Sequence, residues 1–346
     1  MSTERTEIEK LGEFGLIERL TQNFETLNAS TQLSIGDDAA VIDHFGKQTV
    51  VTTDLLIEGV HFDLMYTPLK HLGYKSVVVN LSDIYAMNAQ PTQITMSVAF
   101  SNRFSLEALE EFYEGVAIAC EKYGVDLIGG DTSTSQKGLI ISVTALGEVA
   151  PDAYIKRSTA ESGDLICVSG DLGAAFLGLT LMEREKQIFL ENPQIQPNLE
   201  NEDYIVGRLL RPEARKDIIE LLEKLEIKPT SMMDISDGLS SDVLHLCKQS
   251  ELGCRIYEEK IPINEASKAA AFKFGLDATV CALNGGEDYE LLFTMKQADY
   301  DKITMQEEIS VIGYMCDASE GNKLITKGNN LFDITAQGWN AFGKEA

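Results

Sequence analysis

The sequence contains little that would suit a nucleic-acid-binding, membrane-spanning or secreted protein. Its 29 Lys and Arg residues are outnumbered by 55 Asp and Glu residues, which gives a formal net charge of −26. Such a surface repels nucleic acids and anionic membranes, since both bind basic patches. No apolar run is long enough to span a bilayer, and the first residues lack the apolar core of a signal peptide. We therefore expect a cytoplasmic protein with neither nucleic-acid nor membrane partners.

Cysteine pairs at metal-binding spacing are also missing. The chain has six cysteines, none of them in a C-x-x-C pair, and most lie in apolar runs. This distribution is typical of buried free thiols in a reducing compartment rather than of disulfides or a zinc site.

The standard phosphate-binding signatures are absent as well. The chain has no G-x-x-x-x-G-K-[ST] loop, no G-x-G-x-x-G fingerprint and no protein-kinase H-R-D or D-F-G set. In Asp234-Ile235-Ser236-Asp237 the second aspartate lies three positions after the first. A haloacid-dehalogenase phosphatase would need the second aspartate two positions after the first, so this motif does not fit that class. A nucleotide bound to this chain would therefore be held mostly through metal ions.

Acidic residues next to glycine, small or apolar residues are what the chain does contain. The most prominent is Gly36-Asp37-Asp38-Ala39, where two adjacent carboxylates repel one another unless a cation lies between them or they point apart. Hard oxygen ligands without a His or Cys cluster suit magnesium better than zinc. Further acids of this kind are Asp54, Asp83, Asp131, Asp234 and Asp237.

Each of these acids has a simpler interpretation when it is taken alone. Asp234 and Asp237 could cap the helix predicted to begin at Leu239, and Asp131 after Gly129-Gly130 could form an ordinary Asx turn. Gly170-Asp171-Leu172-Gly173 resembles an anion-binding turn before a helix, although packing is the favoured interpretation there. The metal hypothesis gains from the number of acidic stretches with apolar rather than charged neighbours.

The length of 346 residues favours two domains. We place the boundary in the Pro151–Gly163 segment and predict domains at 1–150 and 151–346. Both show alternating helical and strand patterns, which predicts an α/β (α+β) fold. Predicted strands include 48–53, 92–100, 125–128, 139–149 and 164–168, and predicted helices include 7–27, 68–88, 105–123, 174–184, 204–225 and 239–250.

Taken together, the motifs resemble the thiamine-monophosphate kinase family of the aminoimidazole-ribonucleotide-synthetase-like superfamily. The resemblance extends from Gly12-Glu13-Phe14 to Gly338-Trp339. Its order and number make it specific, whereas any one motif alone would be weak. The matching stretches are Ile35–Val41, Thr53–Phe62 (TDLLIEGVHF), Gly73–Pro91, Gly129–Thr132, Arg211-Pro212, Asp234–Asp242 (DISDGLSSD) and Gly285–Thr294 (GGEDYELLFT).

The resemblance implies that ATP and thiamine monophosphate give ADP and thiamine diphosphate, the last step of thiamine diphosphate biosynthesis. It implies an N-terminal ATP- and metal-binding domain whose sheet pairs with that of a second subunit in a homodimer, followed by a C-terminal α/β layer. The implied cofactor is Mg²⁺, with several ions bound and ATP as co-substrate.

Site roles follow from the resemblance position by position. The implied magnesium ligands are Asp38, Thr52, Thr53, Asp54, Asp83, Asp131, Asp234 and Asp237. The implied ATP contacts are Gly130, Asp131, Arg157 and Ser236, and the implied thiamine-phosphate contacts are His61, Glu287 and Trp339. The residues expected to matter most for catalysis are Asp38, Asp54, Asp83, Asp131 and Arg157, while Asp37 is either an outer ligand or holds the turn.

Several of these residues keep a structural alternative. His61 lies in an apolar stretch and could be a core histidine, and Trp339 could be a packing anchor. Glu287 could simply begin a strand, and Arg157 could form a surface ion pair. The sequence departs from the family pattern at Asn88, where glycine is usual, but it loses no expected ligand.

Two other kinds of function compete with this interpretation. Selenophosphate synthetase and aminoimidazole ribonucleotide synthetase belong to the same superfamily. Selenophosphate synthetase normally carries a reactive cysteine or selenocysteine near its N-terminus, but no cysteine precedes Cys120 in this chain. Aminoimidazole ribonucleotide synthetase is not expected to show the His61, Glu287 and Trp339 set. A non-catalytic metal-binding protein would need a contiguous D-x-D-x-D-G loop, which the chain lacks.

Overall fold

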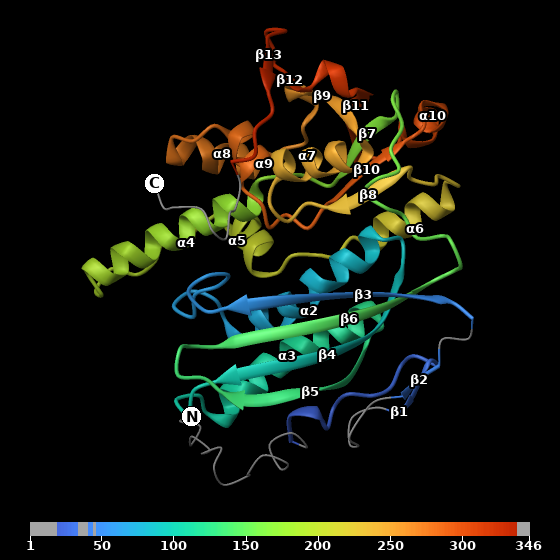
Figure 1. Cartoon of the computed structure of the whole chain (residues 1–346). Coiled ribbons are helices and arrows are strands. Elements are labelled where there is room, and N and C mark those ends of the chain that lie inside the picture. The colour runs from blue at the N-terminus through green and yellow to red at the C-terminus, as the bar shows by residue number, and fades with distance from the viewer. Residues whose placement is uncertain (1–18, 34–40, 44–45, 338–346) are drawn as a thin grey trace. The chain divides into compact units, whose positions relative to one another are not determined.

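The computed structural model describes residues 19–33, 41–43 and 46–337 of the chain. The chain divides into two compact units, unit 1 up to Tyr154 and unit 2 from Ile155. Each unit combines a β-sheet with helices (Figure 1), which confirms the expected mixed α/β class. No helix within the described ranges is both long and apolar enough to cross a membrane.

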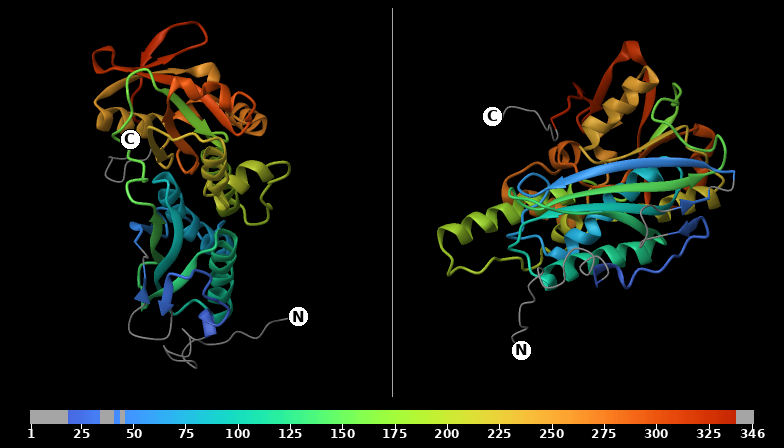
Figure 2. Two further views of the ribbon diagram at one scale, coloured as in Figure 1. Left: turned by 90° about the vertical axis from the view of Figure 1, so that its right-hand side faces the viewer. Right: turned by 60° about the horizontal axis from the view of Figure 1, so that its bottom comes forward.

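Unit 1 is built on a sheet of strand order β3-β6-β4-β5. Strands β4 and β5 run parallel, whereas β6 is antiparallel to both of its neighbours. Helices α2 and α3 lie on one face of this sheet (Figures 1 and 2). The elements of unit 1 are β1 (Thr31–Leu33), β2 (Val41–Ile42), β3 (Gln48–Ile57), α2 (Leu69–Ala86), β4 (Gln90–Phe100), α3 (Leu106–Tyr123), β5 (Asp126–Thr134) and β6 (Ile140–Val149).

Side chains of the sheet alternate between the helix-covered face and the opposite face. In β6, Ile141, Val143 and Ala145 are fully buried, while Ser142 and Thr144 between them are half-buried. Because the side-chain period of a strand is two, one face of β6 packs against the core and the other does not. This alternation decides which site residues of unit 1 can meet.

Helices α2 and α3 cross at two glycines. A Cβ atom on Gly73 would lie 1.9 Å from the carbonyl oxygen of Phe112, and one on Gly115 would lie 1.8 Å from that of Lys70. Only glycine allows two helix backbones to approach so closely. The crossing therefore fixes α2, which carries Asp83, against α3.

A buried carboxylate attaches the segment around residues 27–31 to strand β5. Asp126 is 1% exposed and accepts hydrogen bonds from the backbone N–H of Leu27 and Asn28, at 2.5 and 3.1 Å, and from the hydroxyl of Thr31 at 2.6 Å. These bonds satisfy a charge that would be costly to bury alone. They also fix the chain just ahead of the Gly36–Ala39 stretch.

Unit 2 contains a larger sheet of strand order β13-β12-β9-β11-β7-β10-β8. Neighbouring strands are antiparallel except β9 and β12, which are parallel. The elements of unit 2 are β7 (Leu165–Ser169), α4 (Ala174–Glu191), α5 (Asp203–Leu210), α6 (Lys216–Lys224), β8 (Ser231–Asp234), α7 (Leu239–Ser250), β9 (Leu252–Tyr257), α8 (Glu265–Phe274), α9 (Ala278–Asn284), β10 (Leu291–Met295), α10 (Tyr300–Ile303), β11 (Ile309–Asp317), β12 (Asn322–Ile325) and β13 (Leu331–Asp333).

The core of unit 2 has two apolar clusters. One joins helix α7 to the sheet through residues such as Leu239, Val243 and Ile256. The other joins α4, α5, α8 and α9 through residues such as Leu177 and Ile205. The packing of helices α4 and α7 thereby fixes the polar turns that precede them, Gly170–Gly173 and Asp234–Gly238.

Some predicted elements differ from the observed ones. Strand β5 was expected to end before Gly129-Gly130 but continues to Thr134, and β3 continues past Asp54 to Ile57. The single helix predicted over 204–225 is two helices, because Pro212 lacks a backbone N–H and cannot continue a helix. Most of the predicted helix at 7–27 lies outside the described residues.

Candidate functional site

Asp54 and Asp83 form the acidic part of the candidate site in unit 1. Asp54 lies in β3 on the face that α2 covers, and its backbone N–H donates to Asn80 Oδ1 of α2 at 3.0 Å. Burial, together with the negative charge of Asp83, raises the pKa of the Asp54 carboxyl to about 6. Asp83 in turn accepts a 2.6 Å hydrogen bond from the hydroxyl of Thr52. Two carboxylates this close favour a cation between them.

Thr53 lies on the opposite face of β3. Its hydroxyl donates to the carbonyl oxygen of Val143 at 3.0 Å and accepts from the hydroxyl of Thr144 at 3.1 Å. Since neighbouring strand residues point to opposite faces, Thr52 and Asp54 share a face from which the Thr53 side chain is excluded. The geometry thus favours Thr52 over the Thr53 hydroxyl as a partner of the two acids.

Asp131 also lies away from the Asp54–Asp83 pair. It is exposed in β5 and pairs with Ser97 of β4, which continues through Ser142 to Leu55 in the sheet register. This register puts Asp131 on the Leu55 face, three strand spacings or about 14 Å from β3. The alternative of an ordinary Asx turn at Asp131 is not observed, since this residue belongs to strand β5.

Gly130 is required by the close approach of two strands. A Cβ atom there would lie 1.8 Å from the carbonyl oxygen of Met96 in β4, whereas a Cβ on Gly129 would meet nothing within 4 Å. The sequence is compatible with a turn after Gly129-Gly130. In the structure, glycine is required at position 130 because strand β5 packs closely against β4 there.

His61 follows strand β3 and is half-buried. Its Nδ1 atom accepts a hydrogen bond of 3.0 Å from the backbone N–H of Ile57. An accepting Nδ1 carries no proton, so in the neutral ring the proton is on Nε2. This bond fixes the orientation of the imidazole.

In unit 2, the turn Asp234–Gly238 connects strand β8 to helix α7. Asp234 is 3% exposed, while Ser236 and Asp237 are half-buried. The N-cap of α7 is Gly238, and no side chain makes a cap hydrogen bond there. Neither Asp234 nor Asp237 is therefore the capping residue of this helix.

Asp242 is a buried acid near this turn that sequence reasoning did not single out. It is 1% exposed, and its Oδ2 atom has no hydrogen-bond partner among the described residues. Burial, and then the charges of Asp234 and Asp237, raise the pKa of its carboxyl to about 8. The excess of negative charge at this turn suits a bound cation.

Glu287 lies in a segment hydrogen-bonded to the same turn. Its backbone N–H donates to the carbonyl of Ser236 at 2.7 Å, and that of Tyr289 donates to the carbonyl of Ile235 at 2.9 Å. The N–H of Ile235 donates back to the carbonyl of Glu290 at 2.8 Å. The predicted ATP contact Ser236 and the predicted substrate contact Glu287 are thus joined directly through the backbone.

The remaining predicted residues are more isolated or lie outside the described ranges. Arg157 is exposed. Asp37, Asp38 and Trp339 are outside the described residues. Within the ranges the structure describes, no group of three or more His, Cys, Asp or Glu side chains is arranged to hold a metal ion.

Comparison with known proteins places these features in a family. Residues 36–149 match the model of the AIR synthase related protein N-terminal domain, and residues 161–321 match that of the C-terminal domain. The thiamine-monophosphate kinase of Aquifex aeolicus is 34% identical over 335 residues, which are 97% of this chain and 99% of that protein. The chain belongs to the thiamine-monophosphate kinase family.

Solved structures agree with membership of the thiamine-monophosphate kinase family. The structure of AaThiL complexed with AMPPCP and TMP matches with a TM-score of 0.75 and 32% identity, covering 99% of this chain and 100% of that one. Thiamine-monophosphate kinase from Stenotrophomonas maltophilia K279a matches with a TM-score of 0.78 and 32% identity, covering 94% and 98% of the two chains.

Several buried polar residues of this thiamine-monophosphate kinase family member were missed by sequence reasoning. The quoted family stretches contain Asn80, Asp242, Asp288 and Glu290 without assigning them a role. A charged residue inside an otherwise apolar run was the available signal. It identifies a buried acid but does not reveal its partner.

Proposed function

We propose that this protein transfers the γ-phosphoryl group of ATP to thiamine monophosphate and forms thiamine diphosphate and ADP. One observation carries the proposal: similarity to thiamine-monophosphate kinases over 97% of the chain, at 34% identity. Similarity to AaThiL complexed with AMPPCP and TMP, over 99% of the chain at 32% identity, supports both substrates.

The acceptor needs no general base from the protein. The second pKa of a phosphate monoester is near about 6, so the attacking oxygen of thiamine monophosphate is largely deprotonated at neutral pH. The chain must instead orient two polyanions and reduce their repulsion. Direct in-line transfer without a phosphoenzyme is the mechanism we propose.

Magnesium fits the acidic groups of both units. Asp54 and Asp83, with the Thr52 hydroxyl, would hold it in unit 1, and Asp234 and Asp237 would do so in unit 2. The raised pKa of Asp54 supports this fit, since a neighbouring cation would stabilise its ionised form. When bound, Mg²⁺ supplies positive charge that offsets the negative charge of the phosphates. The roles of Asp38, Thr53 and Asp131 as further ligands rest on family resemblance.

We assign the substrate contacts from the same resemblance. ATP would contact Gly130, Asp131, Arg157 and Ser236. Thiamine monophosphate would contact His61, Glu287 and Trp339, where an aromatic ring suits the cationic thiazolium. His61 can offer its Nε2–H to an oxygen of the substrate, because Nδ1 already accepts from Ile57.

We further propose that the protein is a homodimer paired through the unit 1 sheet. Val51 and Leu55 of β3 are 60% and 50% exposed, and both lie on the face opposite Asp54. Exposed apolar side chains on one sheet face support a covered surface. Light scattering after size exclusion should give twice the chain mass of 38.1 kDa; a mass of one chain would contradict the dimer.

The activity test is an incubation of the purified protein with ATP, Mg²⁺ and thiamine monophosphate. We expect thiamine diphosphate and ADP in equal amounts, and no product once magnesium is chelated. Absence of thiamine diphosphate with the metal present would refute the proposed function. Asp54→Asn and Asp83→Asn should each abolish turnover while the fold is retained, and activity in both would refute the metal assignment.

The chemical course can be tested separately with a chiral phosphate. ATP made chiral at the γ-phosphorus should give inversion of configuration in thiamine diphosphate, as expected for a single displacement. Retention would show two displacements and hence a phosphoenzyme.

A further inference from the structure

The segment Gly285–Glu290 has an unusual backbone. Gly286, Glu287 and Tyr289 have φ angles of 72°, 58° and 52°. Residues other than glycine rarely adopt this left-handed backbone conformation, because the Cβ atom then crowds the following carbonyl oxygen. Two such residues within three positions require surrounding structure that holds them there.

Two buried carboxylates lie within the same segment. Asp288 and Glu290 are each 1% exposed. The carboxylate of Asp288 accepts the backbone N–H of Gly173, at 2.9 and 3.1 Å to its two oxygens. Gly173 precedes helix α4, so an internal carboxylate already occupies the N-terminus of this helix.

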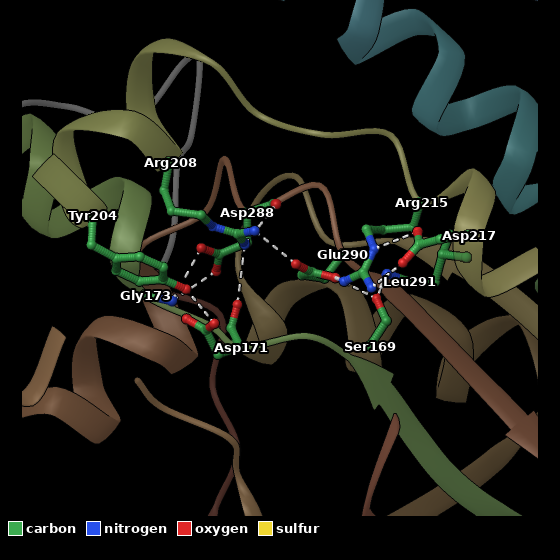
Figure 3. Close-up of polar contacts among 10 residues, drawn as sticks. All are labelled: Ser169, Asp171, Gly173, Tyr204, Arg208, Arg215, Asp217, Asp288, Glu290 and Leu291. Atoms are coloured by element: carbon green, nitrogen blue, oxygen red, sulfur yellow. Dashed lines mark hydrogen bonds and ion pairs between the residues drawn. The ribbon is translucent and has the colours of Figure 1, made fainter. Parts of the chain in front are cut away.

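Glu290 is bridged by two arginines (Figure 3). Oε1 accepts from Nη1 of Arg208 at 2.8 Å, while Oε2 accepts from Nη1 of Arg215 and from the hydroxyl of Ser169. Both arginine side chains are largely buried, at 16% and 11% exposure. A buried carboxylate with this many charge-assisted bonds has little freedom to move.

Arg208 also bonds to the backbone of the strained segment. Its Nη2 atom donates to the carbonyl oxygens of Asp288 and Asp171, each at 3.2 Å. One guanidinium therefore connects the Glu290 side chain, the main chain next to Glu287, and the turn before α4. A lysine has the charge but not the planar fork needed for all three acceptors.

We propose that Glu290, bridged to Arg208 and Arg215, is a positioning residue that holds Glu287 in the left-handed conformation needed to bind thiamine monophosphate. The inference rests on the proposed function, in which Glu287 contacts that substrate. Ser236, the proposed ATP contact, is joined to Glu287 by one backbone hydrogen bond, but it is also fixed by strand β8 and helix α7 on either side of its turn. Loss of the Glu290 bridge should therefore act mainly on the acceptor substrate.

The test compares the two Michaelis constants of Glu290→Gln, which keeps the shape of the side chain and removes its charge. We expect the KM for thiamine monophosphate to rise at least tenfold. The KM for ATP and kcat should both stay within about threefold. A matched loss in both KM values, or an unchanged KM for thiamine monophosphate in a folded variant, would overturn the proposal.

Arg208→Lys is the second variant, and it should shift the KM for thiamine monophosphate in the same direction. Glu220→Gln is the control for loss of a negative charge, because the Glu220 side chain is 65% exposed and its ion pair among the described residues is with Lys216 at 3.8 Å. This control should leave both KM values unchanged. Arg215→Lys also keeps a positive charge beside Glu290. It should raise the KM for thiamine monophosphate less than Arg208→Lys does.

Urea unfolding of each variant shows whether it is folded under the assay conditions. If Glu290→Gln does not fold, Arg208→Lys and Arg215→Lys decide the question by the same split between the two KM values. Wild-type protein that forms no thiamine diphosphate refutes the proposed function itself. Calorimetric titration with thiamine monophosphate alone would then show whether Glu290→Gln weakens binding of this molecule, and equal affinity would overturn the positioning role.

Discussion

The carboxyl group of Asp54 lies where its ionised form is disfavoured. Burial and the neighbouring charge of Asp83 raise its pKa from 3.8 to about 6. A shift of this size corresponds to about 3 kcal/mol at neutral pH, at 1.36 kcal/mol per pKa unit. The metal-free protein therefore retains a residue that lowers its own stability, as expected for a group kept for binding.

Replacing this residue should separate stability from activity. Asp54→Asn removes the buried charge, so we expect the free energy of unfolding of the metal-free protein to rise by about 1–3 kcal/mol at pH 8. Turnover should fall by at least about a hundredfold. Urea unfolding in chelator and the thiamine diphosphate assay measure the two effects.

Glu121→Gln provides the control for Asp54→Asn, since Glu121 is an exposed residue of α3. It should change neither quantity. A destabilised Asp54→Asn protein would show that the carboxylate of Asp54 contributes favourable contacts to the metal-free fold.

At the scale of single residues, sequence reasoning found acids but could not find their neighbours. Asp54 lies near Asp83 because helix α2 packs on strand β3. Asp131 is separated from both because the strand register places it on the opposite face of the sheet. Neither is encoded within a few residues of the acids. The bridge from Glu290 to Arg208 joins positions 82 residues apart, which no local pattern can reveal.

Helix glycines show how one residue type can serve opposite purposes. Gly115 of α3 lies against the backbone of α2, whereas Gly207 of α5 has nothing within 4 Å of an added Cβ. Glycine is intrinsically unfavourable within a helix. Its presence at Gly115 is explained by packing, and at Gly207 nothing in the described structure requires it.

Alanine substitutions at these two positions should have opposite signs. Gly115→Ala should destabilise the protein by about 3 kcal/mol or more, because the helix backbones must separate. Gly207→Ala should stabilise it by about 0.5–1 kcal/mol through helix propensity. Thermal and urea unfolding measure both, and a neutral Gly115→Ala would contradict the close crossing.

Elements with clear end signals were predicted well. Helix α7 begins at Leu239 and ends at Ser250 as expected, and Ser105 caps α3 through the N–H of Ala108 at 3.3 Å. Predictions failed where glycine had a role other than turning the chain, as at Gly130 in β5. The break at Pro212 was missed because the apolar pattern continues across it.

The whole molecule carries a large excess of negative charge, and some of it is buried. Besides Asp54, burial raises the pKa of Asp242 to about 8 and that of Asp288 to about 7. The folded protein keeps protons on these acids that the unfolded chain releases near their ordinary pKa of 3.8. Their contribution to stability is therefore fully present below about pH 4, and it is lost as the pH rises from there to the folded-state pKa values of about 6 to 8.

The metal-free protein should accordingly be more stable at pH 5.5 than at pH 8, by about 2 kcal/mol in the free energy of unfolding. Added Mg²⁺ should restore stability at pH 8, because it stabilises the ionised carboxylates of the folded state. Urea unfolding at both pH values, with chelator or with magnesium, measures this. Stability that rises with pH in chelator would contradict the prediction.

At the same scale, the alternating helical and strand patterns predicted the mixed α/β class correctly, but the strand order could not be read from the chain. In unit 2, β7 lies between β10 and β11, which are distant in sequence. Such pairings depend on contacts between remote segments. Local propensities do not specify them.

The glycine crossing of α2 and α3 also limits how the site can move. Helix α2 cannot turn about its axis or slide along α3 unless the backbones at Gly73 and Gly115 first separate. Asn80 and Asp83 are residues of α2, so their backbone positions stay fixed relative to α3. Any adjustment on substrate arrival must come from side-chain rotation or from β3, so slow exchange measured by NMR relaxation should be confined to the strand side of the Asp54–Asp83 pair.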